Sequence, residues 1–319
     1  MIVDDLSPEA VNFLEAFPTD DTPIDFSRIE EIRAETISNF APAAERAIER
    51  HAIAREDIEV ASISCEHIRS TRTQTSTGTL LYLFGGGFIV GNPYCDLPII
   101  GALAELCHVD VIAPKYSLAP EHPAPAAIND CMNVYREVAQ STVGRLLLAG
   151  ESAGGNLALL VAQSAVNENI RVPDAMGLLS PAADLRANSN LFEPTYTLDP
   201  TLSQVIMTDV LAAYLPGMDP KDPLLSPIFG DMGGLPPTII TTGTRDLLLA
   251  MCLRTARAMH RANVDVDTRV WNGFWHVFEF YDDYPESAES LSEIATFLNS
   301  RSQVVDLLVD RAGIEPTTT

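Results

Sequence analysis

The stretch RLLLAGESAGGNLALLVAQSAV, residues 145–166, decides the fold. Its first part, RLLLA, is a short apolar run typical of a buried strand, and its last part, NLALLVAQSAV, is typical of a helix. Between them Ser152 is followed by the small residues Ala153, Gly154 and Gly155, as a strained strand-to-helix turn requires, because larger side chains there would clash with the neighbouring strand or helix. The pattern indicates a nucleophilic serine held at the end of a strand. The alternative is a serine that only caps the helix.

Strands and helices continue to alternate on both sides of this stretch. Apolar strands are expected at 80–84, 109–114, 145–149, 176–180, 237–242 and 264–271. Helical patterns are found at 97–107, 126–139, 155–166 and 247–262, and a last helix begins near Ser287. This alternation predicts an α/β fold, with a mostly parallel central sheet and helices on both of its faces.

Two segments depart from the alternation. Residues 1–55 have the pattern of short helices broken by acidic residues. Residues 182–237 are rich in Pro and Asp, contain one amphipathic helix, and are too long for a simple connection. We therefore expect a helical cap formed by both segments, a catalytic domain at 56–300, and a C-terminal extension at 301–319.

The composition describes a globular chain with an acidic surface. Hydrophobic residues make up 46% of the 319 residues and charged residues 20%, which separates the chain from disordered proteins. The 44 acidic and 20 basic residues give a net charge of −24. Because such a charge repels nucleic acids and anionic membranes, we expect neither as a partner.

Three features predict a cytoplasmic location. The five cysteines form no CxxC motif and no disulfide framework, as expected of buried free thiols in a reducing compartment. The first residues, MIVDDLSPEA, lack the basic and apolar regions of a signal peptide. No apolar run reaches the roughly 18 residues of a membrane-spanning helix.

Ser152 needs a base, because a serine hydroxyl is a poor nucleophile at neutral pH. In folds with this strand-turn-helix serine, the acid and then the histidine follow the serine along the chain, each in a loop after a strand. His276 fits this order, whereas His260 falls within a helical pattern and the other four histidines precede Ser152. We therefore expect His276 to be the base and activity to rise with pH near its ordinary pKa of about 6.5.

The acid that orients the base is predicted to be Asp246. It follows the strand at 237–242 and precedes His276, whereas Asp282 and Asp283 come after the histidine and would invert the order. The alternative role for Asp246 is to cap the helix that follows it.

A second glycine-rich turn follows an earlier strand, in LYLFGGGFIVGN (81–92). Glycine allows main-chain N–H groups to approach a ligand closely. In this arrangement the oxyanion of the reaction is bound by N–H groups from this loop, here Gly86 and Gly87, and from the residue after the nucleophile, Ala153. The alternative for the three glycines alone is a tight turn.

These motifs together resemble the bacterial hormone-sensitive-lipase-like esterases of the α/β-hydrolase superfamily. FGGGFIVGN (84–92) is similar to the HGGG loop of that family, YSLAPEHPAPAAIND (116–130) to its YRLAPEHPFPAA segment, and GESAGG (150–155) to its GDSAGG turn. GTRDLLL and WNGFWHVF then follow in family order. The resemblance covers about residues 79–298. It implies an α/β-hydrolase fold with a cap insertion at about 187–215, and a carboxylesterase without cofactor or metal that hydrolyses short- to medium-chain esters.

The chain departs from the family pattern at two positions. Phe84 stands where the family has histidine, and Glu151 where it most often has aspartate. The family histidine braces the oxyanion loop, so Phe84 must brace it by packing. We expect Phe84 to leave the oxyanion hole usable while it changes the rigidity of the loop or the adjoining pocket.

Several residues beside these motifs are candidates for lining the substrate pocket. They are Phe84, Phe88, Glu151, Trp275 and Val277. Trp275 lies between Phe274 and His276, and these aromatic residues indicate either an apolar pocket wall or an ordinary core.

The motifs predict acyl transfer but leave the substrate open. Besides an ester hydrolase, the same site would suit a lactone hydrolase or another acyl-transfer enzyme. An alternative hypothesis is that the chain is a non-catalytic binding protein, since the plant gibberellin receptors share this fold. Those receptors have lost the catalytic histidine, which is present here as His276. By analogy with the family, an edge strand near Val264 to Val270 is a candidate homodimer contact.

Overall fold

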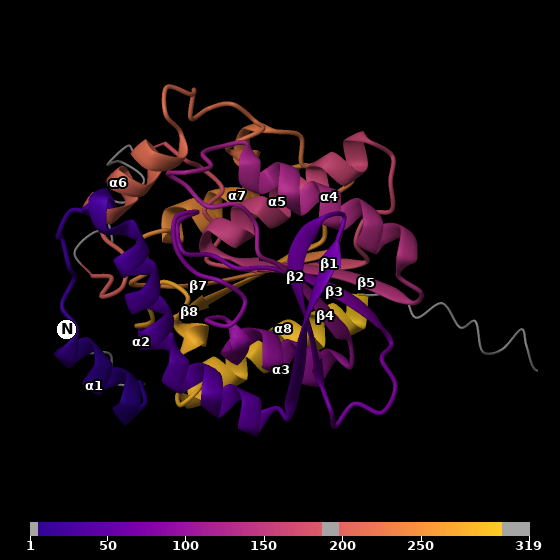
Figure 1. Ribbon diagram of the computed structural model, residues 1–319, viewed down its shortest axis with the longest axis horizontal. Coiled ribbons are helices and arrows are strands. Elements are labelled where there is room, and N and C mark those ends of the chain that lie inside the picture. The colour runs from indigo at the N-terminus through magenta and orange to yellow at the C-terminus, as the bar shows by residue number, and fades with distance from the viewer. Residues whose placement is uncertain (1–5, 187–197, 302–319) are drawn as a thin grey trace, which may run out of the picture.

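The computed structural model describes residues 6–186 and 198–301. Its centre is a sheet of eight strands in the order β1-β2-β4-β3-β5-β6-β7-β8 (Figure 1). The strands are β1 (Ile53–Val60), β2 (Ile63–Ser70), β3 (Gly78–Leu83), β4 (Asp110–Pro114), β5 (Arg145–Glu151), β6 (Ala175–Leu179), β7 (Thr238–Gly243) and β8 (Val266–Trp271). The helices are α1 (Pro8–Ala16), α2 (Ile29–Arg50), α3 (Leu97–Cys107), α4 (Ala126–Ser141), α5 (Ser152–Asn167), α6 (Gln204–Tyr214), α7 (Leu249–Arg261) and α8 (Pro285–Arg301).

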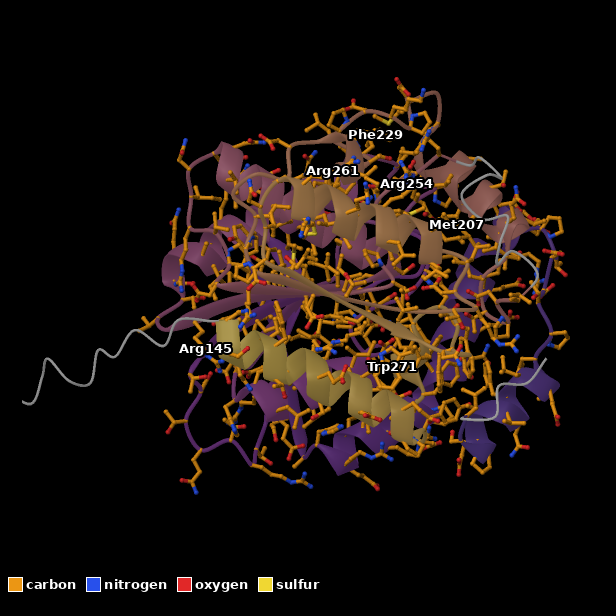
Figure 2. All side chains as sticks on the ribbon, turned by 180° about the vertical axis from the view of Figure 1, so that it is seen from behind. Arg145, Met207, Phe229, Arg254, Arg261 and Trp271 are labelled. Atoms are coloured by element: carbon orange, nitrogen blue, oxygen red, sulfur yellow. The ribbon has the colours of Figure 1, made fainter. Side chains whose placement is uncertain are left out.

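Strands β3 to β8 pair in parallel, as the alternation of strands and helices predicts. All residues of β5 and β7 are buried, because helices cover both faces of a parallel sheet. Helices α3 and α8 lie on one face, while α4, α5 and α7 lie on the other (Figure 1). Figure 2 shows the same arrangement from behind, where Arg254 and Arg261 mark α7 and α8 lies across the sheet from it.

The hairpin of β1 and β2 is not among the strands expected from the sequence. It pairs antiparallel with the rest of the sheet through β2 and β4. Val60 faces Ile63 across the turn, so the two turn residues are Ala61 and Ser62, both with positive φ (51° and 65°). Such a turn normally contains Asn or Gly, and without them the sequence gives no hairpin signal. The expected domain boundary at residue 56 consequently falls inside β1.

The N-terminal segment and α6 lie together at one end of the sheet (Figure 1). Ile24 N donates to Asp209 Oδ2 of α6 at 2.8 Å. In α2, Arg33 Nε donates to Ile89 O at 2.9 Å, which fixes this helix to the glycine-rich loop. These contacts support the expected cap. Of the predicted insertion at 187–215, residues 187–197 lie outside the described residues, and so does the predicted C-terminal extension beyond Arg301, the last residue of α8.

Two simple expectations can be examined in the structure. All five cysteines are buried and free, as predicted. Among the described helices, none combines the length and the apolar character needed to cross a lipid bilayer.

Candidate active site

Ser152 lies where β5 meets α5, in the sharp turn that the sequence predicts. Its φ is +52°, a strained value for a residue with a side chain, and its side chain stays partly exposed. The turn brings its backbone very close to β3: a Cβ atom added at Gly154 would lie 1.9 Å from Leu83 O. This contact explains why small residues follow the serine. Ser152 is the first residue of α5 and Glu151 is its N-cap, so the alternative of a serine that caps the helix is not supported.

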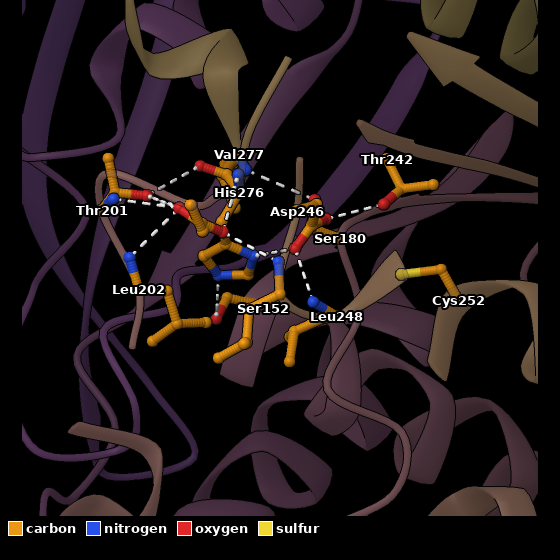
Figure 3. A network of polar contacts seen from close by, with 12 residues as sticks. Ser152, Ser180, Thr201, Leu202, Thr242, Asp246, Leu248, Cys252, His276 and Val277 are labelled. Atoms are coloured by element: carbon orange, nitrogen blue, oxygen red, sulfur yellow. Dashed lines mark hydrogen bonds and ion pairs between the residues drawn. The ribbon is translucent and has the colours of Figure 1, made fainter. Parts of the chain in front are cut away.

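His276 lies in the loop after β8 and faces the serine (Figure 3). Its Nε2 is 2.9 Å from Ser152 Oγ, and its Nδ1 is 3.1 Å from Asp246 Oδ1. These distances are within hydrogen-bond reach, so three residues from three separate loops form one continuous chain of polar contacts. The structure therefore brings together the three residues predicted as nucleophile, base and acid.

Asp246 is fully buried in the loop between β7 and α7. Its Oδ2 accepts a hydrogen bond from Thr242 Oγ1 at 2.7 Å, and its Oδ1 accepts one from Leu248 N at 2.8 Å. Helix α7 begins only at Leu249, and its N-cap, Leu248, makes no side-chain capping bond. Asp246 Oδ1 thus lies against the imidazole, and Leu248, not Asp246, is the N-cap of α7.

The surroundings shift the pKa values of this acid and base in opposite directions. Burial by itself would raise the pKa of Asp246, but His276 and the hydroxyl groups nearby outweigh burial and leave that pKa below its ordinary value. Burial would lower the pKa of His276, but the carboxylate of Asp246 and, less strongly, that of Asp199 raise it above its ordinary value. The site therefore favours an ionised Asp246 and a histidine that is more basic than in water.

The predicted oxyanion loop follows β3. Gly86 and Gly87 both have positive φ (+87° and +62°), and a Cβ at Gly86 would lie 2.3 Å from Val90 O. Within the described part of the chain, the N–H groups of Gly86, Gly87 and Ala153 donate no hydrogen bond to another protein group. Main-chain donors without partners are uncommon, so these amides are suited to bind an anion at the site.

Phe84 and Glu151, the two departures from the family pattern, both lie behind this loop and are almost fully buried. The Phe84 ring stacks on Tyr116, with centroids 4.1 Å apart, and Tyr116 Oη donates to Phe84 O at 2.6 Å. The expected bracing by packing is thus present. The carboxyl of Glu151 lies against Gly85, where an added Cβ would be 2.0 Å from Glu151 Oε1.

The other three pocket candidates are also buried. Phe88 stacks on Tyr214 of α6 with centroids 3.8 Å apart. Trp275 stacks on Phe13 of α1 at 4.6 Å, in an aromatic cluster that corresponds to the core alternative. Val277 N donates to Ser180 Oγ at 3.3 Å beside the triad. These residues support the site from behind, and a substrate pocket lined by the five remains a prediction.

A cavity of about 480 Å³ is lined in part by Phe84. Phe84, Tyr116, Arg55 and Lys115 are among its lining residues, and none of the three triad residues lines it. The described residues contain no group of three or more His, Cys, Asp or Glu side chains placed to hold a metal ion.

Asp199, which is not predicted from the sequence as a site residue, contacts the backbone of the triad histidine. Asp199 is fully buried, and its Oδ2 accepts hydrogen bonds from His276 N and Leu247 N. The segment Asp199-Pro200-Thr201 has a local signal, because Asp with Thr two residues later is typical of a turn closed by the aspartate side chain. That signal predicts a turn but says nothing about a partner far away in the sequence.

Comparisons with known proteins agree with this fold. The profile of a family described as alpha/beta hydrolase fold matches residues 80–280. An esterase from Acinetobacter venetianus is 30% identical over 247 residues, which cover 76% of this chain and 81% of that protein. An acetyl-hydrolase from Streptomyces hygroscopicus is 30% identical over 246 residues, covering 76% of this chain and 82% of that protein.

Solved esterase structures share the fold over most of the chain. One esterase from the bacterial hormone-sensitive lipase family superposes with a TM-score of 0.82 at 27% identity, covering 93% of this chain and 99% of that one. Esterase E25 superposes with a TM-score of 0.84 at 25% identity, covering 95% and 96%. The fold and the site thus define an α/β hydrolase. Within that class the chain belongs to the hormone-sensitive-lipase-like carboxylesterases, as its motifs predict.

Proposed function

We propose that this carboxylic ester hydrolase is a serine esterase that cleaves short- to medium-chain esters through an acyl-enzyme. The observation that carries the proposal is the unbroken contact from Ser152 Oγ through His276 to Asp246, at 2.9 Å and 3.1 Å. A binding protein would have no use for such an aligned nucleophile and base, so this contact favours an enzyme.

In the first half of the reaction, Ser152 Oγ attacks the carbonyl carbon of the ester and its proton passes to His276 Nε2. Asp246 stabilises the imidazolium that forms. The negative oxygen of the tetrahedral intermediate is bound by the amides of Gly86, Gly87 and Ala153, and each such donor contributes about 3–4 kcal/mol in other enzymes. When the intermediate collapses, His276 Nε2–H protonates the leaving alcohol and the acyl group stays on Ser152.

In the second half, water takes the place of the alcohol. His276 Nε2 accepts a proton from the water while the water oxygen attacks the acyl carbon. The same amides bind the oxyanion that forms. Collapse breaks the bond to Ser152 Oγ, which recovers its proton from His276. The carboxylic acid leaves, and the enzyme returns to its starting state.

The position of α6 supports short acyl chains. A Cβ added at Gly87 would lie 3.0 Å from Val210 Cγ1, so this cap helix packs directly against the oxyanion loop. The stacked rings of Phe88 and Tyr214 close the same side. A long acyl chain would have to displace these buried side chains, which makes it a poorer substrate.

The test is hydrolysis of p-nitrophenyl acetate, butyrate, octanoate and laurate, with a simple lactone added. We expect turnover to be highest with acetate or butyrate and to fall with octanoate and laurate. Ser152→Ala should abolish turnover, whereas Ser141→Ala, at the exposed end of α4, should match the wild type. Full activity in Ser152→Ala would refute the mechanism, and preference for laurate or the lactone would refute the substrate class.

Location and assembly are part of the same proposal. Five buried free thiols suit the reducing cytoplasm. Strand β8 is the last in the sheet and Val270 on it is exposed, which supports a homodimer through this edge. With a net charge of −24, neither nucleic acid nor an anionic membrane is proposed as a partner. Cell fractionation tests the cytoplasmic location, and light scattering of the purified protein tests the homodimer.

A further inference from the structure

Asp199 is a fully buried carboxylate whose two oxygens accept five hydrogen bonds. A buried charge is costly unless other groups satisfy it. Here hydrogen-bond donors do so. Oδ1 accepts from Thr201 N at 2.9 Å, Thr201 Oγ1 at 2.9 Å and Leu202 N at 3.2 Å. Oδ2 accepts from Leu247 N at 2.9 Å and His276 N at 3.3 Å.

These donors come from three segments that are far apart in the sequence. Thr201 and Leu202 belong to the segment that leads into α6 of the cap. Leu247 directly follows the triad acid, and His276 is the triad base. Figure 3 shows Thr201 and Leu202 on one side of the His276 ring and Thr242 on the other. One side chain of the cap thus joins the loop of the acid to the loop of the base.

The pattern of donors requires a carboxylate. Both oxygens of Asp199 face donors only, so the position has no place for an N–H or O–H group. In an asparagine of the same shape, the NH₂ group would replace one of the two carboxylate oxygens and would face hydrogen-bond donors there. Asp199 also places a second carboxylate near Asp246, whose charge raises the pKa of Asp199. A positive charge that forms between the two carboxylates during the reaction would be stabilised by both.

We propose that Asp199 is a positioning residue of the triad, which holds His276 in register with Asp246 and stabilises the imidazolium formed during acyl transfer. The proposal rests on the esterase function proposed above. According to this proposal, the cap both covers the substrate and contributes a side chain that positions the triad.

The charges around His276 agree in sign with this role. Burial lowers the pKa of His276, but the charges of Asp246 from the loop before α7, Asp199 from the cap, and Glu279 from the turn Phe278–Phe280 raise it. In return, burial and the charge of Asp246 raise the pKa of Asp199, while His276 lowers it. Replacing Asp199 by a neutral group should therefore make His276 less basic.

The test compares Asp199→Asn with the matched control Asp209→Asn. Asp209 is also an aspartate of the cap, and its carboxylate accepts a backbone N–H from Ile24, which belongs to neither loop of the triad. With p-nitrophenyl butyrate, Asp199→Asn should lower kcat by about 100-fold, because a displacement of about 1 Å has that effect. KM should change much less, and the acid limb of kcat/KM should move to lower pH. Asp209→Asn should leave both the rate and the limb unchanged.

A purely structural Asp199 would give a different result. Asp199→Asn would then unfold at lower denaturant concentration, but the folded enzyme would keep its kcat and its acid limb, and the proposal would be overturned. If Asp199→Asn does not fold, Thr201→Val takes its place. It removes one donor from Asp199 at an exposed residue and should lower kcat a few-fold, and an unchanged kcat would count against the proposal.

Titration of His276 by NMR of histidine-labelled protein separates this proposal from the esterase function, because it needs no turnover. A lower pKa of His276 in Asp199→Asn than in the wild type would support the positioning role even if no ester were hydrolysed. An unchanged pKa in a folded variant, together with an active wild type, would leave the esterase function standing and overturn the role of Asp199.

Discussion

The two sides of the site are held in place by different forces. On the side of the base, His276 and Asp246 are fixed by hydrogen bonds to buried polar groups, including a carboxylate from the cap. On the side of the oxyanion loop, the aromatic stack of Phe84 and Tyr116 lies behind the glycines. A polar network depends on the identity of single atoms, whereas a packed aromatic pair depends mainly on volume. The first side should therefore be sensitive to isosteric changes and to pH, and the second to the loss of side-chain bulk.

The largest effect is expected from Asp246→Asn, which changes one atom on the polar side. The amide cannot stabilise the imidazolium and favours the wrong tautomer of His276, so kcat should fall about 10³- to 10⁴-fold. Steady-state kinetics on p-nitrophenyl butyrate measure this, with circular dichroism to verify folding. A loss below tenfold would show that the polar side does not depend on this contact.

The pH dependence is the next largest effect. His276 must be neutral to accept the proton of Ser152, and its pKa is raised by Asp246 although burial opposes this. Activity should therefore rise with pH, with an acid limb of kcat/KM above the ordinary value of about 6.5. At pH 5 the rate should be more than about 30-fold below its plateau, because each pH unit below the pKa costs a factor of ten. A flat profile between pH 5 and pH 8 would rule out a histidine base.

Some residues of the site can be predicted from the sequence, and others cannot. Ser152, His276 and Asp246 can be predicted because chain order and the strand-loop pattern favour them over the other serines, histidines and aspartates. Asp199 is not predicted, because its partners Leu247 and His276 become neighbours only after the cap folds onto the sheet. Nor does the sequence predict the β1–β2 hairpin, whose turn lacks the usual Asn and Gly.

The residues predicted to line the substrate pocket show a second reason why sequence alone does not place a side chain. Trp275 is next to the catalytic histidine in sequence, yet its ring stacks on Phe13 from the N-terminal helix. Adjacent residues point in different directions, so proximity in sequence does not place a side chain in a site. Glu151 likewise directly precedes Ser152, but its carboxyl lies behind the oxyanion loop.

Loss of bulk on the apolar side is tested by Phe84→Ala. Removing the buried ring leaves a cavity beside Tyr116, and the free energy of unfolding should fall by about 3–5 kcal/mol. The folded variant should still hydrolyse p-nitrophenyl butyrate within about tenfold of the wild-type rate, because the glycine amides remain. Phe17→Ala, at a phenylalanine that is 54% exposed, is the control and should cost much less in a denaturant titration.

The family residue gives a second test of the same position. Phe84→His should change kcat or the preference among p-nitrophenyl esters, because it exchanges bracing by packing for bracing by a polar side chain. Identical kcat and an identical substrate profile would show that Phe84 has no influence on the loop.

The smallest effect is expected from Tyr116→Phe, which removes the hydrogen bond from the stacked aromatic pair to the backbone of the loop. The hydroxyl of Tyr116 donates to Phe84 O at 2.6 Å inside the core, so its removal leaves a buried carbonyl short of a donor and should cost about 1–2 kcal/mol of stability. Because the stacked ring stays, kcat should remain within about threefold of the wild type. Tyr94→Phe, which removes a hydroxyl bound to the exposed Glu45, is the matched control and should leave both stability and rate unchanged. If Tyr116→Phe instead lowered kcat as strongly as Asp199→Asn, the loop would depend on a single hydrogen bond, and the contrast between a polar and an apolar side of the site would be wrong.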